Sequence, residues 1–111
     1  MSNNRQDKKF TYHATFIAVV IKDGSVSDDE LEELSERIGN SWEKLARRLN
    51  FNKAEIVGFH KNNEEYAKKA LSMLEKWKEK YGSGATYKVL FEALCHRLVG
   101  RRDLAEEFCT I

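Results

Sequence analysis

Hydrophobic residues recur at helical spacing along most of the chain, beginning just after Ser27. Ser27 and Glu30 form a capping box, in which the serine hydroxyl accepts from a first-turn amide and the glutamate reaches back to the serine amide. Gly39 closes the same helix, as glycine often does after the last helical residue. Between these ends, apolar residues three and four positions apart line one face: Leu31, Leu34 and Ile38. The pattern predicts a first helix over 27–39.

Two short helices are predicted next. Residues 40–43 have the composition of a second capping box and open a helix whose apolar face carries Trp42, Leu45, Ala46 and Leu49. Asn52 and Glu55 predict the start of a third helix, with Ile56 and Phe59 as its apolar residues. Both tryptophans of the chain, Trp42 and Trp77, lie on apolar stripes, so we expect them in the core.

Three more helices complete the prediction. The fourth and longest opens at Asn63 and ends at 82–84, and its predicted stripe is Ala67, Ala70, Leu71, Leu74 and Trp77. The fifth begins near Ala85 and stops before Gly100, and its predicted stripe is Tyr87, Leu90, Phe91, Leu94 and Leu98. A short sixth helix carries Leu104, Ala105 and Phe108. Because every helix has one apolar stripe and the connections are short, we expect antiparallel packing around one shared core.

The N-terminal residues differ from the rest of the chain. Residues 1–9 are polar, whereas 10–21 are rich in β-branched and aromatic side chains, which indicates an extended segment or strand. Residues 23–25 then mark a turn. We therefore predict a flexible or extended N-terminal segment over 1–24 and a helical domain over 25–111. The segment is either the end of a preceding domain in a larger scaffold or a part that packs on the helices, and both interpretations stay open.

Length and composition narrow the class of protein. A chain of 111 residues suits one domain, and 41% hydrophobic residues suffice for one modest core. A net charge of +1 gives no overall field that would attract nucleic acid or an anionic membrane. No apolar run reaches about 18 residues, so no transmembrane helix is predicted. Cys95 and Cys109 are too few for a disulfide framework, and we interpret them as reduced intracellular thiols.

The sequence gives no pattern for catalysis, metal or cofactor binding. Cys95 and His96 are adjacent, and adjacent residues of a helix point about 100° apart, so they do not form a nucleophile–base pair. The histidines His13, His60 and His96 have no paired spacing of the kind that zinc sites use. The segment 82–84 is glycine-rich but lacks the lysine of a phosphate-binding loop. We therefore predict a protein that is not an enzyme and holds no metal or cofactor.

The order of the predicted helices resembles a known family, although no single element is specific. The pattern Trp42-x-x-Leu45-Ala46-x-x-Leu49 is similar to the second helix of death domains, and Leu71-x-x-Leu74-x-x-Trp77 to their fourth. Gly84-Ala85-Thr86 resembles the start of the fifth helix and 102–106 the sixth. The resemblance covers 27–109; residues 95–100 are longer than the pattern, and 1–24 have no counterpart. The stripe ending at Trp77 favours a death domain over the related caspase-recruitment and death-effector domains.

This resemblance implies an all-α, six-helix antiparallel bundle of Greek-key topology, the death fold. It also implies an interaction module of an intracellular adaptor or receptor, in apoptotic or inflammatory, NF-κB-type signalling. Such modules act by homotypic association and oligomeric assembly, which concentrates caspases or kinases. The expected partners are other death-domain proteins and further copies of this chain, without nucleic acid or membrane insertion. The expected location is cytoplasmic, and the domain may belong to the cytoplasmic part of a larger receptor or scaffold by the same resemblance.

Charged residues provide the candidate contact surfaces. Residues 25–39 contain six acidic residues and one arginine, a balance of −5, so the remaining residues carry +6. The acidic helix start either complements the helix dipole or forms a docking patch, and both interpretations stay open. The basic candidates are Arg47, Arg48, Lys53, Arg101 and Arg102. The acidic candidates are Asp28, Asp29, Glu32, Glu33, Glu64, Glu65 and Asp103. Arginine suits such contacts because its planar fork pairs with carboxylates, and the alternative is a solvated face.

A helix-turn-helix nucleic-acid-binding domain is the alternative function. It is suggested by the second and third helices, which are short and joined by a tight turn. The acidic first helix and the near-zero net charge oppose it, because phosphate would be repelled rather than attracted.

Overall fold

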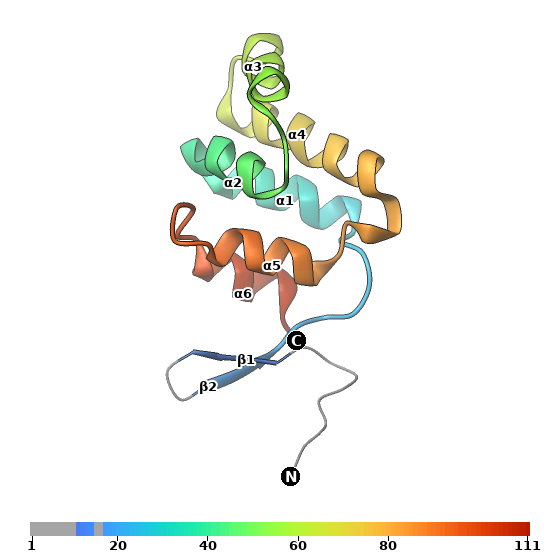
Figure 1. Ribbon diagram of the computed structural model, residues 1–111, viewed down its shortest axis with the longest axis vertical. Coiled ribbons are helices and arrows are strands. Elements are labelled where there is room, and N and C mark those ends of the chain that lie inside the picture. Colours follow the sequence, from blue (N-terminus) through green and yellow to red (C-terminus); the bar gives the residue numbers. More distant parts are fainter. Residues whose placement is uncertain (1–10, 15–16) are drawn as a thin grey trace.

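Six α-helices and one small hairpin make up the described part of the chain (Figure 1). The structure is a computed structural model that describes residues 11–14 and 17–111. The helices are α1 (Asp28–Ile38), α2 (Trp42–Arg48), α3 (Lys53–Asn62), α4 (Tyr66–Tyr81), α5 (Tyr87–Cys95) and α6 (Arg102–Cys109). Short 3-10 turns, η2 (Gly39–Ser41) and η3 (Gly82–Gly84), follow α1 and α4. The strands β1 (Thr11–Ala14) and β2 (Ile17–Val20) pair antiparallel beside the bundle. The predicted all-α class is confirmed.

Two helices begin with capping boxes, one at Ser27, where a box was predicted, and one at Asn52, where the start of a helix was predicted. At α1, the Ser27 hydroxyl accepts from the Glu30 amide at 3.2 Å, and the Glu30 carboxylate accepts from the Ser27 amide at 3.3 Å. At α3, the Asn52 side-chain oxygen accepts from the Glu55 amide at 2.8 Å, and the carboxylate of Glu55 accepts from the Asn52 amide at 2.9 Å. Each box satisfies two amides that the first turn leaves without helical partners.

The predicted starts of two other helices are wrong. The helix α2 follows η2 directly, and Ser41 before it makes no side-chain capping bond. The helix α4 begins at Tyr66 rather than at Asn63. Asn63 instead lies after the end of α3, where its amide nitrogen donates to the Phe59 carbonyl at 3.1 Å. An asparagine can donate through its amide as well as accept through its oxygen, so the same residue type serves either end of a helix.

The core contains both tryptophans, as predicted, with Trp42 2% and Trp77 1% exposed. The apolar stripes differ from the prediction at two places. On α4, Met73 is fully buried, whereas Leu71 is only half-buried. Leu98, predicted for the fifth stripe, is 48% exposed because α5 already ends at Cys95. The turn that follows reverses the chain at Gly100, whose φ of 67° favours glycine, and buries the neighbouring Val99 instead.

A short extended segment, residues 20–26, runs along the ends of the bundle, and we call it the strap. Its side chains Ile21 and Val26 are each 1% exposed and belong to the same core as the helices. Backbone hydrogen bonds fix the strap at two places. Near the C-terminal residues, Lys22 N donates to Cys109 O at 2.8 Å and Ile111 N donates to Val20 O at 3.0 Å. Near the start of α5, Val26 N donates to Ala85 O at 3.0 Å and Tyr87 N donates to Gly24 O at 3.1 Å.

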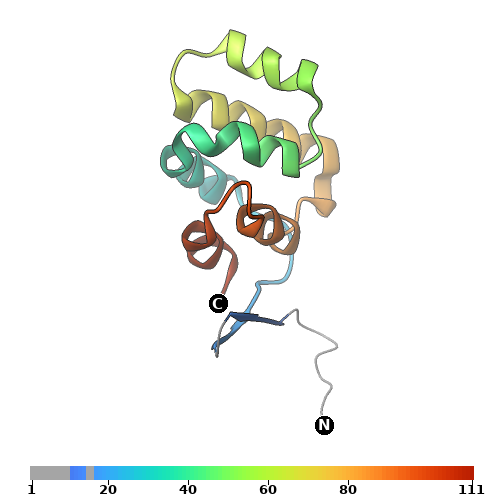
Figure 2. The ribbon, with the colours of Figure 1, turned by 60° about the vertical axis from the view of Figure 1, so that its left-hand side comes forward.

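The packing of the helices places α1 and α6 on one side of the molecule and the C-terminal end of α2 with α5 on the other (Figure 2). The helix α1 packs mainly on α4, and α5 packs mainly on α6. In the turned view, α1 and α6 lie to the left, and the C-terminal end of α2 lies to the right with α5 (Figure 2). Ion pairs connect neighbouring helices at the rim of the core: Asp28–Lys78 at 2.9 Å, Arg37–Glu107 at 2.9 Å and Glu55–Lys80 at 3.3 Å.

Candidate protein-interaction surfaces

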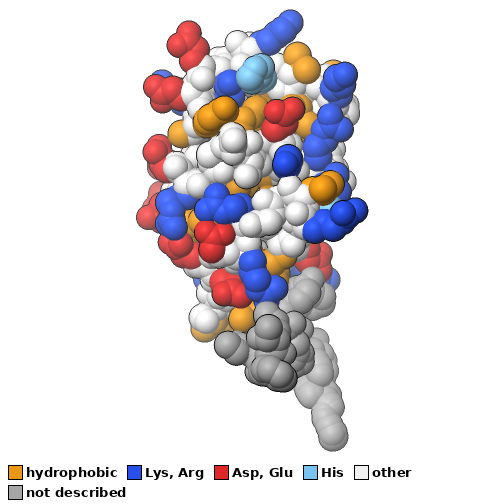
Figure 3. All heavy atoms as spheres, turned by 90° about the vertical axis from the view of Figure 1, so that its left-hand side faces the viewer, with side chains coloured by type: hydrophobic (Ala, Val, Ile, Leu, Met, Phe, Trp, Pro, Cys, Tyr) orange, Lys and Arg blue, Asp and Glu red, His pale blue; other side chains and the backbone are white. Residues whose placement is uncertain are grey.

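Four carboxylates cover the exposed side of α1, and we call them the acidic α1 face: Asp29, Glu32, Glu33 and Glu36. Their spacing places them opposite the buried Leu31, Leu34 and Ile38. All four are exposed and line a surface depression. Within the described residues, none of them forms an ion pair. Figure 3 shows acidic side chains gathered along its left edge, the side on which α1 and α6 lie.

The other acids of α1 are already engaged. Asp28 pairs with Lys78 of α4. Glu30 points to the strap and α5, where it accepts from Lys22 Nζ at 2.8 Å and from the Tyr87 hydroxyl at 2.5 Å. Burial raises the pKa of Glu30, but hydrogen bonds from Lys22, Tyr87 and Ser27 outweigh burial and lower this pKa to about 2. The capping glutamate is therefore also a link between three parts of the fold.

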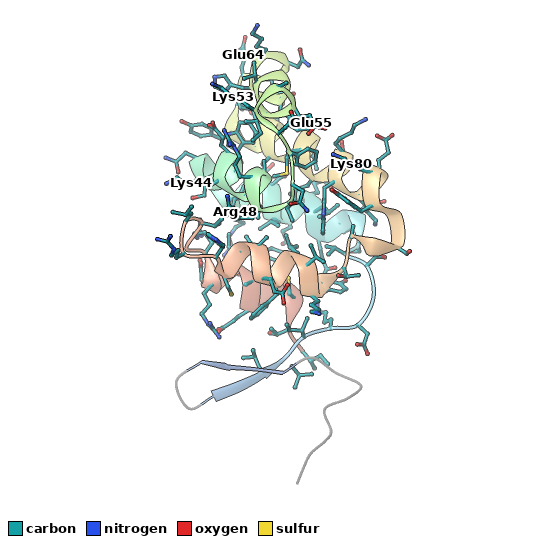
Figure 4. The ribbon with its side chains drawn as sticks, in the orientation of Figure 1. Lys44, Arg48, Lys53, Glu55, Glu64 and Lys80 are labelled. Carbon is teal, nitrogen blue, oxygen red and sulfur yellow. The ribbon has the colours of Figure 1, made fainter. Side chains whose placement is uncertain are left out.

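Basic side chains gather on the other side of the molecule, along the right edge of Figure 3. Arg47 and Arg48 end α2, and Lys53 begins α3; all three are exposed. Figure 4 labels Lys44, Arg48 and Lys53, which lie on this part of α2 and α3. A depression between α2 and α5, here called the α2–α5 groove, is lined by Arg47, Arg48, Asn50, Val89, Glu92, Ala93 and His96. The groove thus combines two guanidinium groups with one carboxylate and the apolar side chains of Val89 and Ala93.

The arginines at the start of α6 have carboxylate partners on their own helix. Arg101 donates from Nε and Nη2 to the two carboxylate oxygens of Asp103, both at 3.0 Å. This hydrogen-bonded pairing raises the pKa of Arg101 and lowers the pKa of Asp103. Arg102 donates to Glu106 at 2.7 Å, and its guanidinium carbon lies 6.0 Å from the centre of the Phe91 ring. Asp103 and these two arginines are therefore engaged in ion pairs at the beginning of α6.

A comparison with protein families identifies the chain. The family model named Death domain matches residues 28–110. The chain belongs to the death domain family. Death domains are non-catalytic protein-interaction modules of apoptotic and inflammatory signalling. Membership confirms the predicted six-helix death fold and the prediction that the protein is not an enzyme.

The twelve candidate residues of this death domain do not converge on one site. Asp29, Glu32 and Glu33 belong to the acidic α1 face, and Arg47 and Arg48 line the α2–α5 groove. Glu64 and Glu65 are exposed on the connection between α3 and α4. Asp28, Arg101, Arg102 and Asp103 are paired within the domain. Among the described residues, the candidates thus divide into those that form ion pairs inside the domain and those that form none, although Arg48 contacts His96.

The structure adds several residues to these surfaces that the sequence did not indicate, and two of them are charged or can be charged next to a candidate: Glu36 and His96. Glu36 completes the acidic α1 face, and its place one turn beyond Glu32 is visible in the sequence. His96 lines the groove of the death domain beside Arg48, which lies 48 positions away in the chain. No local spacing connects such residues, so only the folded chain reveals this contact.

Membrane-spanning helices and metal sites are two further kinds of feature that the part of the chain described by the structure lacks. None of its helices is long and apolar enough to cross a membrane. Among the same residues, no three His, Cys, Asp or Glu side chains lie together as a metal site would require.

Proposed function

We propose that this death domain binds other death domains, copies of itself included, by placing the acidic α1 face of one domain against the α2–α5 groove of the next. The observation that carries the proposal is the presence of two exposed surfaces of opposite charge on different helices. Complementary charge steers partners into register and disfavours like-charged surfaces. The carboxylates of the face suit the planar guanidinium groups of the groove.

The different positions of the two surfaces favour an open assembly. A contact between two unlike surfaces is heterologous, so each added copy leaves a free face at one end and a free groove at the other. Individual exposed ion pairs contribute only about 0.2–1 kcal/mol, so many repeated contacts would be needed to hold such an assembly together. We propose that the assembly serves a cytoplasmic adaptor or receptor of apoptotic or NF-κB-type signalling, where it would concentrate caspases or kinases.

The remaining candidates enter the proposal as secondary contacts. Lys53 lies at the start of α3 on the basic side and extends that surface. Glu64 and Glu65 extend outward from the α3–α4 connection. Arg101, Arg102, Asp28 and Asp103 would have to give up or share their present ion pairs before they met a partner. The proposed contact therefore rests first on the acidic α1 face and on Arg47 and Arg48.

Sedimentation velocity with two complementary variants tests the proposal. Arg47→Glu/Arg48→Glu reverses the groove, and Glu32→Lys/Glu33→Lys reverses the face. Each variant should stay monomeric at concentrations where the parent domain assembles, and an equimolar mixture should associate again, because the intact face of one variant meets the intact groove of the other. The control Lys61→Glu/Lys68→Glu changes the net charge as the groove variant does, at exposed positions outside both surfaces, and should assemble like the parent.

Capture of partners from cytosol tests the wider role. The parent domain should retain a death-fold protein, and Arg47→Glu/Arg48→Glu should lose it. Arg101→Glu/Arg102→Glu, tested in parallel, should retain the partner as far as it remains folded. If only Arg101→Glu/Arg102→Glu loses the partner, the contact lies at the start of α6 and not in the groove. Absence of any death-fold partner and of self-assembly at all salt concentrations would contradict the proposed function.

A further inference from the structure

Three tyrosine rings whose side chains the structure describes each lie close to a lysine ammonium group, and the three lysines differ in their other partners. The distance from Nζ to the ring centre is 4.9 Å for Lys22 and Tyr87, 5.8 Å for Lys80 and Tyr81, and 5.5 Å for Lys69 and Tyr66. Lys22 and Lys80 also pair with the carboxylates of Glu30 and Glu55. Within the described residues, Lys69 has no carboxylate at ion-pair distance.

Lys69 is also the one buried charged residue in the described part of the chain, since it is only 6% exposed. Its Nζ atom lies 2.9 Å from Nδ1 of His60, which belongs to α3. An imidazole carries no negative charge, and a buried charge in a protein is ordinarily compensated by an opposite one. Lys69 therefore holds a positive charge that lacks a counter-ion among the described residues.

Tyr66 lies at the surface next to this buried lysine, as the first residue of α4. It is 53% exposed, against 39% for Tyr81, and its hydroxyl forms no hydrogen bond within the described residues. The connection before it is not helical, because Asn63 and Glu65 have extended backbone angles. Figure 4 labels Glu64 on this connection, at the outer end of the molecule. Exposed, non-helical backbone is the part of a domain that a modifying enzyme reaches most easily.

We propose that Tyr66 is phosphorylated by a tyrosine kinase and that the ammonium group of Lys69 is the counter-ion of its phosphate. In this reaction the γ-phosphorus of ATP forms a bond to Oη of Tyr66, its bond to the ADP oxygen breaks, and the phenol proton passes to the catalytic carboxylate of the kinase. The phosphate carries a charge of about −1.5 to −2 at neutral pH. A small rotation of the exposed ring brings it to Nζ of Lys69, which already lies over the ring.

The charges around Tyr66 favour one class of kinase and distinguish this tyrosine from Tyr81. Glu64 and Glu65 are exposed directly before Tyr66, and they complement a kinase whose substrate cleft is basic. Tyr81 ends α4, where the helix dipole disfavours a phosphate, and its neighbour Lys80 already has a carboxylate partner. Tyr66 is therefore the exposed tyrosine whose lysine is available to a phosphate.

Phosphorylation of the folded domain by a purified tyrosine kinase that prefers acidic residues before its target tests the site. Mass spectrometry of peptides measures the rate at each tyrosine. Tyr66 should be modified about tenfold faster than Tyr81, because Tyr81 must first leave the helix. Glu64→Gln/Glu65→Gln should slow the modification of Tyr66 about two- to fivefold, the size expected of exposed charge contacts. Equal rates at Tyr66 and Tyr81, or no modification of Tyr66, would overturn the assignment.

Phosphorus NMR of the phosphorylated domain tests the role of Lys69. The phosphate of phosphotyrosine loses its second proton at about pH 6, and a neighbouring ammonium group moves this titration to lower pH. The folded parent should titrate about one pH unit below Lys69→Met, whose unbranched side chain suits a buried position. Lys68→Met, at an exposed neighbouring position, should titrate like the parent. The parent unfolded in urea is a second reference that needs no variant, and it too should titrate at higher pH than the folded parent.

The two measurements fail separately. If the folded parent, the unfolded parent and Lys69→Met titrate at the same pH, Lys69 is not the counter-ion, even where Tyr66 is the residue modified. Neither Tyr66 nor Lys69 belongs to the acidic α1 face or to the α2–α5 groove. Failure of this proposal therefore leaves the proposed contact between face and groove unaffected.

Discussion

Arg47 and Arg48 end α2, whereas Arg101 and Arg102 open α6, and only the second pair meets carboxylates of its own helix. Arg101 holds Asp103 through two hydrogen bonds, and Arg102 holds Glu106 one turn later. Arg47 and Arg48 line a groove in which Arg48 faces a histidine ring. The difference teaches that a charged side chain at the surface is not always available to a partner protein. An arginine that is paired with a carboxylate of its own domain must give up that carboxylate before it can bind another.

The same division runs through α1. Glu30 accepts hydrogen bonds from the strap and from α5, whereas Glu32, two residues later, belongs to the acidic α1 face. Engaged charges of this kind should affect folding when they are changed, and charges without partners should affect association. Four substitutions test that distinction, and they follow from the largest expected effect to the smallest.

Glu30→Gln should destabilise the domain by about 2 kcal/mol at neutral pH, because a carboxylate that accepts several hydrogen bonds loses its charge. The pKa of Glu30 is about 2 in the folded domain and about 4.5 when unfolded. Its contribution is therefore complete above pH 4.5 and is lost as the pH falls toward 2. Denaturant titrations should show the gap between parent and variant closing over that interval. Glu32→Gln is the control and should leave stability within about 0.5 kcal/mol.

Arg47→Glu/Arg48→Glu should weaken self-association at least tenfold, about 1.4 kcal/mol, while the melting temperature stays nearly constant. Reversal places like charges against the acidic α1 face, and inside the domain it removes the contact between Arg48 and His96. Light scattering over a concentration series measures the first quantity and circular dichroism the second. A large fall in melting temperature would show that these arginines are structural, as at α6.

Arg102→Ala should lower stability by about 1 kcal/mol, or the melting temperature by about 4–8 °C, without weakening association. The variant loses the hydrogen bond to Glu106 and the contact with the Phe91 ring. Arg47→Ala removes the same type of side chain without either contact and serves as the matched control. Equal decreases in melting temperature in the two variants would contradict the proposed difference between the two pairs of arginines.

Lys44→Glu should produce the smallest effect. It gives Arg48 a carboxylate partner on its own helix, as Arg102 has on α6. A glutamate four positions before Arg48 can pair with it on the helix surface, which stabilises helices by about 0.2–0.5 kcal/mol. Association should then weaken about twofold while the melting temperature rises slightly. Lys44→Gln removes the lysine charge without adding a carboxylate, and it should weaken association less. Stronger association of the glutamate variant would contradict the idea that a local partner reduces the availability of Arg48.

Local signals in the sequence predicted the starts of some helices correctly and failed at others. A capping box formed at Ser27–Glu30, as predicted, and at Asn52–Glu55, where the start of a helix was predicted, but the box predicted at 40–43 did not form. Asn63 carried a one-sided signal, and the structure uses its amide at the end of α3. Leu98 kept the spacing of the α5 stripe, but the helix had already ended. Periodicity alone does not show where a helix stops.

The candidate surfaces could be predicted only in part. The spacing of the acidic α1 face is visible in the sequence, and so is the four-residue spacing of Arg102 and Glu106. The partners of Arg37 and Lys78 lie 70 and 50 positions away, at Glu107 and Asp28. Contacts over such separations depend on how the helices pack, so the sequence showed which residues were charged but not which remained free of partners.

The strap has a mechanical consequence. Residues 20–22 and 109–111 run antiparallel and are joined by two backbone hydrogen bonds. Val20 and Ile111 therefore lie at the same end of this pair of segments, beside the bond that joins them. Tension between the two flanks of the domain would load the Ile111 N–Val20 O bond first and the Lys22 N–Cys109 O bond next, one after the other. Such an arrangement opens like a zipper and yields at low force, whereas bonds loaded side by side would resist in shear. Pulling would therefore peel the strap and its buried Ile21 away before the helices separate.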